Sequence, residues 1–315
     1  MNSTKTWLVT GANGFLGMNA GVFLSGKAHT IGATREPHSS PIFDNHVQFD
    51  IQDLSSVRLT FSSLKPDVVL NTAALASHQL CEENPELALG VNTIGAKNVA
   101  IAAEEIGAQL LHISTDAVFD GKSGNYREDD ATSPFSVYGQ TKLAGEQAVL
   151  TALPTALVVR TNFFGWSPTG ERSILEFFVN SLTQGKRVDG YSNYFVSSIY
   201  AQDLLQALFE LSDFQHAGLL HVVSSDSLSK YDFGVAVARQ WELDSQLIQA
   251  SHDIHHEGTN SLTRDLSLNT DKAMEFLGRR FPTQLEGIQR AKMDLLVVRS
   301  KIVRAESSND REKHD

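Results

Sequence analysis

Cysteine is almost absent from this 315-residue sequence, in which Cys81 is the single one. One thiol excludes an intramolecular disulfide and a four-cysteine metal site, so a reducing, cytoplasmic compartment is expected. Basic residues are in deficit too, with 26 Lys and Arg against 37 Asp and Glu and a net charge of −11. This balance argues against nucleic acid or an anionic membrane as the main partner, since both require a basic surface.

Long apolar runs are also lacking. No run approaches the roughly 20 residues that a membrane-spanning helix needs. Residues 1–5 lead directly into a strand-like segment, without the apolar core of a signal peptide. A hydrophobic content of 41% with 20% charged residues is typical of a soluble globular protein. The length suits one large domain or two of ordinary size.

Short apolar segments alternate with helical patterns through the first half of the chain. Such alternation predicts an α/β fold with a doubly wound parallel sheet, the Rossmann class. Strands are predicted over 6–10, 29–33, 47–51, 67–72, 109–114, 155–160 and, later, 219–223. Helices are predicted after the first strand as far as Leu24 and over 54–64, 92–106, 203–211, 230–241 and 270–277, with another that carries Tyr138.

A glycine-rich turn, Gly-Ala-Asn-Gly-Phe-Leu-Gly at 11–17, joins the first strand to the first helix. Without side chains at Gly11, Gly14 and Gly17, backbone N–H groups and the helix N-terminus can face an anion. The order strand, turn, helix is the one that a dinucleotide site requires. A plain tight turn, with glycines chosen for packing, is the alternative.

Arg35 and Glu36 follow the second predicted strand. At this place an acidic side chain would bind a ribose diol, whereas an arginine can pair with a 2′-phosphate. Arg35 therefore favours NADP, although Glu36 keeps NAD open and the arginine could simply be solvated. Further cofactor contacts are expected where the third and fourth strands end, at Asp50, Ile51, Ala73 and Ala74.

Tyr138 and Lys142 lie four residues apart, and therefore on one face of their predicted helix. A phenol has an unperturbed pKa of about 10, and a fixed positive charge nearby favours its ionised form. Such a tyrosine can exchange a proton with an alcohol oxygen at a carbonyl carbon. Taken alone, the pair is also common on ordinary surface helices.

Hydroxyl residues end the fifth predicted strand at Ser114 and Thr115. Ligands of open parallel sheets bind beyond the carboxyl ends of the strands, so these hydroxyls could hold a substrate carbonyl, or could merely cap a loop. His112, inside the strand, is expected to be a core histidine. Substrate contacts are predicted for Asp116, and for Asn162 and Trp166 in the aromatic loop after the sixth strand.

The regular alternation breaks down after Trp166. We predict a dinucleotide-binding domain of residues 1–165 plus about 190–225, and a smaller substrate-binding region of 166–189 plus 226–304. Residues 305–315 are polar and charged, and a disordered tail is expected. His252, His255, His256 and Glu257 are the one tempting metal cluster, but adjacent histidines rarely point at one ion, so a polar loop without metal is predicted.

Four segments together resemble the extended short-chain dehydrogenase/reductases. They are 10–17, Asn-Thr-Ala-Ala at 71–74, Ser-Thr-Asp-Ala-Val-Phe-Asp-Gly at 114–121 and Tyr-Gly-Gln-Thr-Lys at 138–142. The third resembles the dTDP-4-dehydrorhamnose reductase branch in particular, which functions in carbohydrate biosynthesis. The resemblance implies that Gly11, Asn13, Gly14, Phe15, Leu16 and Gly17 form the pyrophosphate turn, with Arg35 at the adenosine phosphate.

The resemblance also implies the catalytic roles. Thr115 would bond the substrate oxygen, Tyr138 would be the acid, and Lys142 would bind the nicotinamide ribose and lower the pKa of the tyrosine. Hydride would pass from NADPH to a ketone, and Tyr138 would protonate the alkoxide. The expected substrate is a keto sugar nucleotide or a similar polar ketone, and a homodimer is left open.

This sequence departs from the branch at three places. Ala117 stands where an aromatic residue is usual, Val196-Ser197-Ser198 replaces a proline-threonine pair, and Arg264-Asp265 replaces arginine-proline. The resemblance implies that Arg264 contacts the substrate, at its diphosphate. The departures concern the substrate more than the reductase chemistry. Two alternatives remain open. One is a non-catalytic subunit like the methionine adenosyltransferase regulatory subunit, and the other is a sugar-nucleotide epimerase. A dehydratase is disfavoured because Ala117 occupies the place of its second acidic residue.

Overall fold

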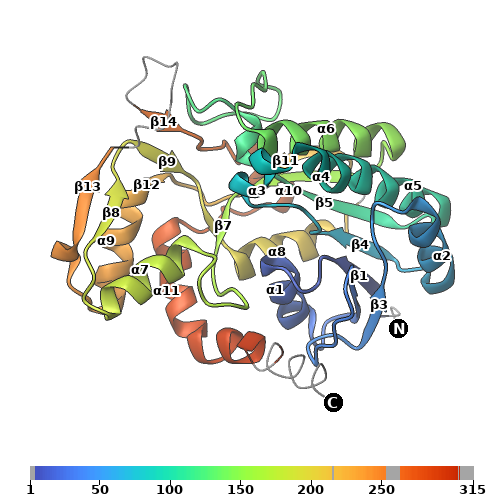
Figure 1. Ribbon diagram of the computed structural model, residues 1–315, viewed down its shortest axis with the longest axis horizontal. Helices are drawn as coiled ribbons and strands as arrows, with labels where there is room; N and C mark the ends of the chain where they lie inside the picture. The colour runs from blue at the N-terminus through green and yellow to red at the C-terminus, as the bar shows by residue number, and fades with distance from the viewer. Residues whose placement is uncertain (1–3, 215, 253–262, 304, 306–315) are drawn as a thin grey trace.

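A parallel sheet of seven strands forms the centre of the computed structural model, which describes residues 4–214, 216–252, 263–303 and 305 (Figure 1). The strand order is β11-β6-β5-β4-β1-β2-β3, and every neighbouring pair runs parallel. This confirms the predicted doubly wound fold. The strands are β1 (Thr6–Thr10), β2 (His29–Thr34), β3 (Asn45–Gln48), β4 (Val68–Asn71), β5 (Gln109–Thr115), β6 (Leu157–Thr161) and β11 (Gly218–His221).

Helices cover both faces of this sheet. Because successive side chains of a strand point to opposite faces, Trp7 and Val9 of β1 pack beneath one layer and Leu8 beneath the other. The first layer consists of α1 (Phe15–Leu24), α8 (Ala201–Leu211) and α10 (Asp271–Leu277). The second consists of α2 (Leu54–Leu64), α5 (Ala96–Ile106) and α6 (Val137–Ala152).

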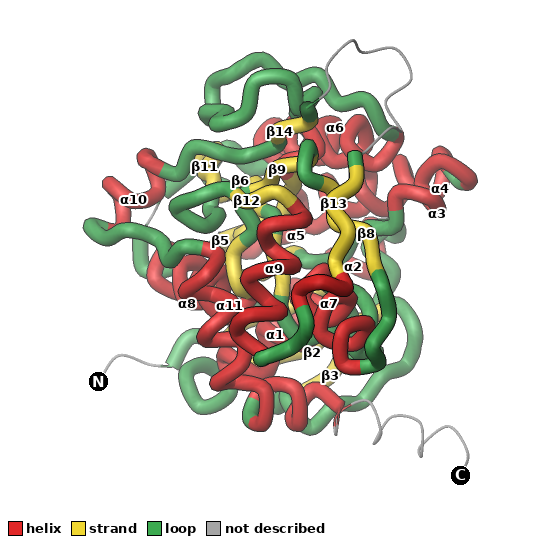
Figure 2. Tube along the Cα trace, turned by 90° about the vertical axis from the view of Figure 1, so that its left-hand side faces the viewer, coloured by secondary structure: helices red, strands yellow, loops and turns green. Residues whose placement is uncertain are grey.

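A smaller group of elements lies beside the sheet, on the left of Figure 1 and toward the viewer in Figure 2. Its core gathers Trp166, Phe178 and Phe233, all nearly inaccessible to solvent. Its helices are α7 (Ile174–Thr183), α9 (Lys230–Trp241) and α11 (Gln284–Met293). Its strands are β8 (Val188–Tyr191), β9 (Tyr194–Val196), β12 (Leu228–Ser229), β13 (Ile248–Ser251) and β14 (Arg264–Asp265). The short pair β7 (Phe163–Phe164) and β10 (Ile199–Tyr200) connects the two groups.

Several predicted boundaries are wrong, and two of these differences have a clear local reason. The third strand ends at Gln48 rather than at 51, because Asp50 turns the chain by accepting a hydrogen bond from the Gln52 backbone at 2.9 Å. The helix predicted over 92–106 begins earlier, as the π-helical turn Gly90–Gly95 that runs into α5. The short helices α3 (His78–Glu83) and α4 (Pro85–Leu89) precede it.

Some predictions fall on parts of the chain that the structure leaves undescribed. These are most of the histidine-rich segment, at 253–257, and nearly all of the predicted tail, at 306–315.

The described residues contain no group of His, Cys, Asp and Glu side chains arranged to hold a metal ion. None of the described helices combines the length and the apolar character that crossing a bilayer demands. The proposed division into two domains stays a prediction.

Candidate active site

The glycine turn packs backbone against backbone. Gly11 has a φ of +65°, and a Cβ on it would lie 2.9 Å from the Cα and N of Ala73. A Cβ on Gly17 would lie 2.2 Å from the Gly11 carbonyl oxygen, so α1 can approach the turn only with glycine there. Gly14 is the N-cap of α1 and supplies no side chain to its first N–H groups. These donors therefore remain available to an anion.

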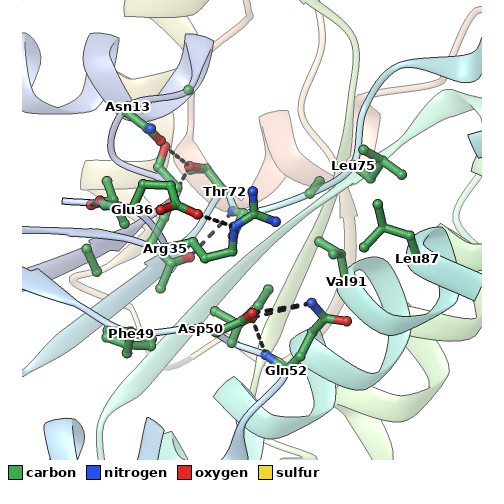
Figure 3. A pocket seen from close by; sticks show the side chains of 18 of the residues that line it. Asn13, Arg35, Glu36, Phe49, Asp50, Gln52, Thr72, Leu75, Leu87 and Val91 are labelled. Carbon is green, nitrogen blue, oxygen red and sulfur yellow. Dashed lines mark hydrogen bonds and ion pairs between the residues drawn. The ribbon is translucent and has the colours of Figure 1, made fainter. Parts of the chain in front are cut away.

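A cavity of about 370 Å³ opens at this turn, where the strand order reverses between β1 and β4 (Figure 3). Asn13, Arg35 and Glu36 lie along one side, and Leu75, Leu87 and Val91 along the other. Carboxyl ends of strands at such a reversal are where open α/β sheets bind ligands. Other predicted cofactor residues that line it are Gly11, Gly14, Asp50, Ile51, Ala73 and Ala74.

Arg35 and Glu36 form an ion pair at the outer end of this first cavity. The Arg35 Nε lies 3.2 Å from a Glu36 carboxylate oxygen, and both side chains are largely exposed, at 60% and 70%. An exposed pair contributes little stability, so either partner can turn to a ligand at small cost. The Arg35 carbonyl accepts a hydrogen bond from Gln48 at 3.1 Å, which holds its backbone beside β3.

A second cavity, of about 760 Å³, adjoins the first. Thr115 at the end of β5 and Tyr138 and Lys142 on α6 all line it, so the structure brings the three predicted catalytic residues together. They meet because α6 packs beside the carboxyl end of β5. Asp116 and Asn162 line the same cavity.

Thr115 is held by its neighbours. Its hydroxyl donates to an Asp116 carboxylate oxygen at 3.0 Å, and the other oxygen accepts from the Asn162 side-chain amide at 2.8 Å. Ser198 donates in turn to the Asn162 side-chain oxygen at 2.5 Å. Burial raises the pKa of Asp116, while these hydrogen bonds and the charge of Arg264 oppose the rise. The chain fixes the Thr115 hydroxyl beside Tyr138.

Burial raises the pKa of Tyr138 to about 12, against which a hydrogen bond with Thr115 acts. The phenol is therefore neutral, and carries its proton, at physiological pH. The expected lowering of this pKa by Lys142 stays a prediction. The Lys142 ammonium donates to the Ile113 carbonyl oxygen at 2.7 Å, and burial lowers its own pKa to about 8.

A buried ion pair lies one turn beyond Lys142. The Arg160 guanidinium lies 2.8 Å from a Glu146 carboxylate oxygen, and both side chains are at most 3% exposed. Ser114 donates to the other oxygen at 2.5 Å. The carboxylate opposes the fall in the pKa of Lys142, so this pair helps to keep the ammonium charged.

Sequence reasoning missed two residues near Tyr138. The His78 ring centroid lies 4.7 Å from that of Tyr138 in the second cavity, and burial lowers the pKa of the imidazole. Asn92 accepts from the Leu75 backbone at 2.8 Å and donates to the Thr141 hydroxyl at 3.1 Å. It thereby ties the wall of the cavity to α6. Neither residue belongs to a motif, and only the tertiary packing reveals it.

Other predicted residues lie away from their expected places. Trp166 is 1% exposed, its indole N–H donates to the Ala291 carbonyl at 3.0 Å, and it lines neither cavity, so it is a core residue. Phe15 and Leu16 line the second cavity rather than the first. The Arg264 guanidinium packs 4.0 Å from the Phe135 ring centroid, just outside the cavity lining. His112 is a buried core residue, as predicted, with Nδ1 3.0 Å from the Asn71 amide.

Residues 5–295 match the protein family described as RmlD substrate binding domain. The chain is a member of the RmlD family. One relative, the dTDP-4-dehydrorhamnose reductase of Mycobacterium tuberculosis, is 34% identical over 249 residues, which are 77% of each chain. The crystal structure of a dTDP-4-dehydrorhamnose reductase from Clostridium acetobutylicum has a TM-score of 0.78 and 28% identity, over 92% of this chain and 99% of that one.

Another relative is not named as a reductase. Methionine adenosyltransferase 2 subunit beta of Xenopus tropicalis is 28% identical over 256 residues, covering 78% of this chain and 75% of that one. Membership of the RmlD family, with its extended short-chain dehydrogenase/reductase fold, confirms the resemblance found in the four sequence segments.

Proposed function

We propose that this RmlD-family protein is an NADPH-dependent reductase of a keto sugar nucleotide. One observation carries the proposal: Thr115, Tyr138 and Lys142 line a cavity that adjoins the glycine-turn cavity. A dinucleotide in the first cavity would thus extend toward an acid and a carbonyl-binding hydroxyl in the second. The relatives named as dTDP-4-dehydrorhamnose reductases support this chemistry.

The residues present fit a dinucleotide. The turn at Gly11, Gly14 and Gly17 packs so closely on neighbouring backbone that a Cβ would collide with it, and an anion at the start of α1 would meet uncapped N–H groups. Arg35 would pair with the 2′-phosphate of NADP, while Glu36 keeps NAD binding open. Asp50 and Ile51 would contact the adenine, and Ala73 and Ala74 would let the cofactor pass close to the backbone.

The reduced nicotinamide supplies a hydride for the carbonyl carbon. The Thr115 and Tyr138 hydroxyls would bind the carbonyl oxygen, and the neutral phenol would give its proton to the alkoxide. Asp116 and Asn162 would position Thr115 through their hydrogen bonds. Lys142 would bind the nicotinamide ribose and place a positive charge beside the reacting oxygen.

The second cavity suits a polar and extended substrate. Tyr194 lines it, and two cations lie over the ring of Tyr194: the Lys230 ammonium at 3.7 Å and the Arg264 guanidinium at 4.7 Å from the ring centroid. Cations of this kind recognise phosphate groups. Ala117 leaves room where the family carries an aromatic ring. These features support a sugar nucleotide, with the identity of the sugar left to experiment.

A panel of keto sugar nucleotides with dTDP, UDP and GDP carriers tests the proposal. The purified protein should oxidise NADPH, followed by absorbance, with at least one member of the panel and should produce the corresponding alcohol. A Thr115→Val variant, which keeps the shape and removes the hydroxyl, should be at least about 100-fold slower. NADPH binding without oxidation across the panel would contradict the proposal.

The relative named as a methionine adenosyltransferase subunit favours a second candidate, a non-catalytic NADP-binding subunit. Such a protein needs the first cavity and a partner surface but has no need of the Thr115 and Tyr138 pair. The panel separates the two functions. Co-purification of a partner enzyme, together with an absence of turnover on every ketone, would favour the subunit.

The cytoplasmic location and the homodimer that the sequence suggested stay predictions.

The pH dependence of turnover should reveal the buried Lys142. Since its pKa is lowered to about 8, its charge is present below that pH and is lost as pH rises through it. We expect kcat/KM to fall about tenfold per pH unit above pH 8 if the charge is required. Profiles of the wild type and of Lys142→Arg, which stays charged, provide the measurement. A flat wild-type profile up to pH 10 would show that the charge is dispensable.

A further inference from the structure

The cofactor and substrate cavities meet at a small set of residues. Gly14, Thr72, Ala74, Leu75 and Arg172 line both of them, and Arg172 is the one charged side chain in this shared set of described residues. Gly14 belongs to the glycine turn, whereas Arg172 comes from the other side of the cleft, immediately before α7. A cation from the smaller group of elements thus lies at the same junction as the glycine turn, whose N–H groups are free to bind a phosphate.

The backbone of Arg172 is fixed while its side chain is exposed. Its N–H donates to the Ser167 hydroxyl at 3.2 Å and to a Glu176 carboxylate oxygen at 3.1 Å. Ser167 and Glu176 are buried, and Ser173 and Glu176 form a capping box at the start of α7. This network anchors the loop independently of the guanidinium. Replacing the side chain should therefore leave the fold intact.

The guanidinium itself has no ion pair or hydrogen bond within the described part of the chain, in contrast to Arg160, Arg279 and Arg280. A guanidinium suits phosphate oxygens, to which it can donate two parallel hydrogen bonds. On the opposite wall, the first backbone N–H groups of α1, which follow Gly14, have no side-chain cap. Donors on both walls would enclose a diphosphate at the junction.

We propose that Arg172 pairs with the pyrophosphate of the dinucleotide cofactor and thereby connects the smaller group of elements, which contains α7, to the glycine turn. The inference rests on the proposed function to the extent that a dinucleotide occupies the first cavity. A sugar nucleotide also carries a diphosphate, but the Arg264 and Lys230 cations over Tyr194, which lines the second cavity, would be the nearer partners for that group. Arg172 lines the junction together with Gly14 of the glycine turn, which favours the cofactor pyrophosphate over the substrate diphosphate as its partner.

Binding titrations on the whole chain test this assignment without turnover. NADPH, NADH and dTDP are titrated separately, by fluorescence or calorimetry, against the wild type, Arg172→Ala and Arg172→Lys. Arg187→Ala is the matched control, because Arg187 is an exposed arginine that lines neither cavity. We expect Arg172→Ala to raise the Kd of NADPH and of NADH by the same factor, about tenfold, because both carry the pyrophosphate. Arg172→Lys should recover part of the loss, and Arg187→Ala should change neither Kd by more than about twofold.

The alternative outcomes are separable. Unchanged NADPH and NADH affinities in Arg172→Ala would overturn the inference, as would a loss confined to dTDP, which would assign Arg172 to the substrate diphosphate. A wild type that binds neither dinucleotide would overturn the proposed function as well as this inference. Circular dichroism and the Tm of each variant show whether the fold is retained, and a variant Tm within about 2 °C of the wild type validates the comparison.

Discussion

Replacing Tyr138 by phenylalanine is expected to lower kcat about a thousandfold while leaving the Kd of NADPH within about twofold of wild type. The change removes one hydroxyl from the second cavity and keeps the ring that packs on His78. Because burial holds the phenol neutral, this hydroxyl is the proton donor that the alkoxide would use. Steady-state kinetics with the best substrate of the panel, together with NADPH titration, provide the measurement.

Tyr126→Phe is the matched control for this variant. The Tyr126 hydroxyl also makes a hydrogen bond, to Asp120 at 2.7 Å, but the residue lies outside both cavities. It should therefore keep nearly normal turnover even if its stability falls. A Tyr138→Phe protein with a near-normal rate would remove the acid from the mechanism, and an equal loss in the control would point to a general loss of structure.

Replacing Arg35 by alanine should weaken NADPH binding about 30-fold and change NADH binding by no more than about twofold. Only NADPH carries the 2′-phosphate with which the guanidinium would pair. Glu36→Gln should act in the opposite direction, because it removes the carboxylate that now lies 3.2 Å from Arg35 Nε and would repel the phosphate. The ratio of the two dissociation constants, titrated for each variant, is the quantity to compare. Equal losses for both cofactors in Arg35→Ala would refute the phosphate role.

The sequence was sufficient for the parts of the fold and site that depend on local pattern. The buried run 6–10 became β1 with the same limits, and the helices over 54–64 and 230–241 have the limits that their apolar spacing predicted. Thr115 could be placed at the ligand-binding edge of the sheet because a parallel sheet gathers its carboxyl ends there, whereas Tyr138 on α6 was joined to it by the family resemblance. The glycine turn was recognisable because its spacing reflects backbone contacts that exclude a Cβ.

The remainder depends on contacts between distant segments. The hydrogen bond from the Lys142 ammonium to the Ile113 carbonyl oxygen follows from how α6 lies against β5. Trp166 follows the strand β6 in a loop where substrate contacts were expected. Its indole is buried, however, and donates a hydrogen bond to a backbone carbonyl of α11. Arg172 belongs to no motif, and its place between the cavities arises only when α7 packs across from the glycine turn.

Transfer of deuterium tests the central claim most directly. The protein is incubated with the active keto sugar nucleotide and NADPH that carries deuterium on the reactive face of nicotinamide C4, with both faces tried separately. Mass spectrometry and NMR of the sugar should find the label on the new carbinol carbon with one of the two cofactors, in stoichiometric amount with the NADP formed. Product that contains no label from either cofactor, or a label that remains in the cofactor while the sugar is epimerised, would contradict a net reduction by this site.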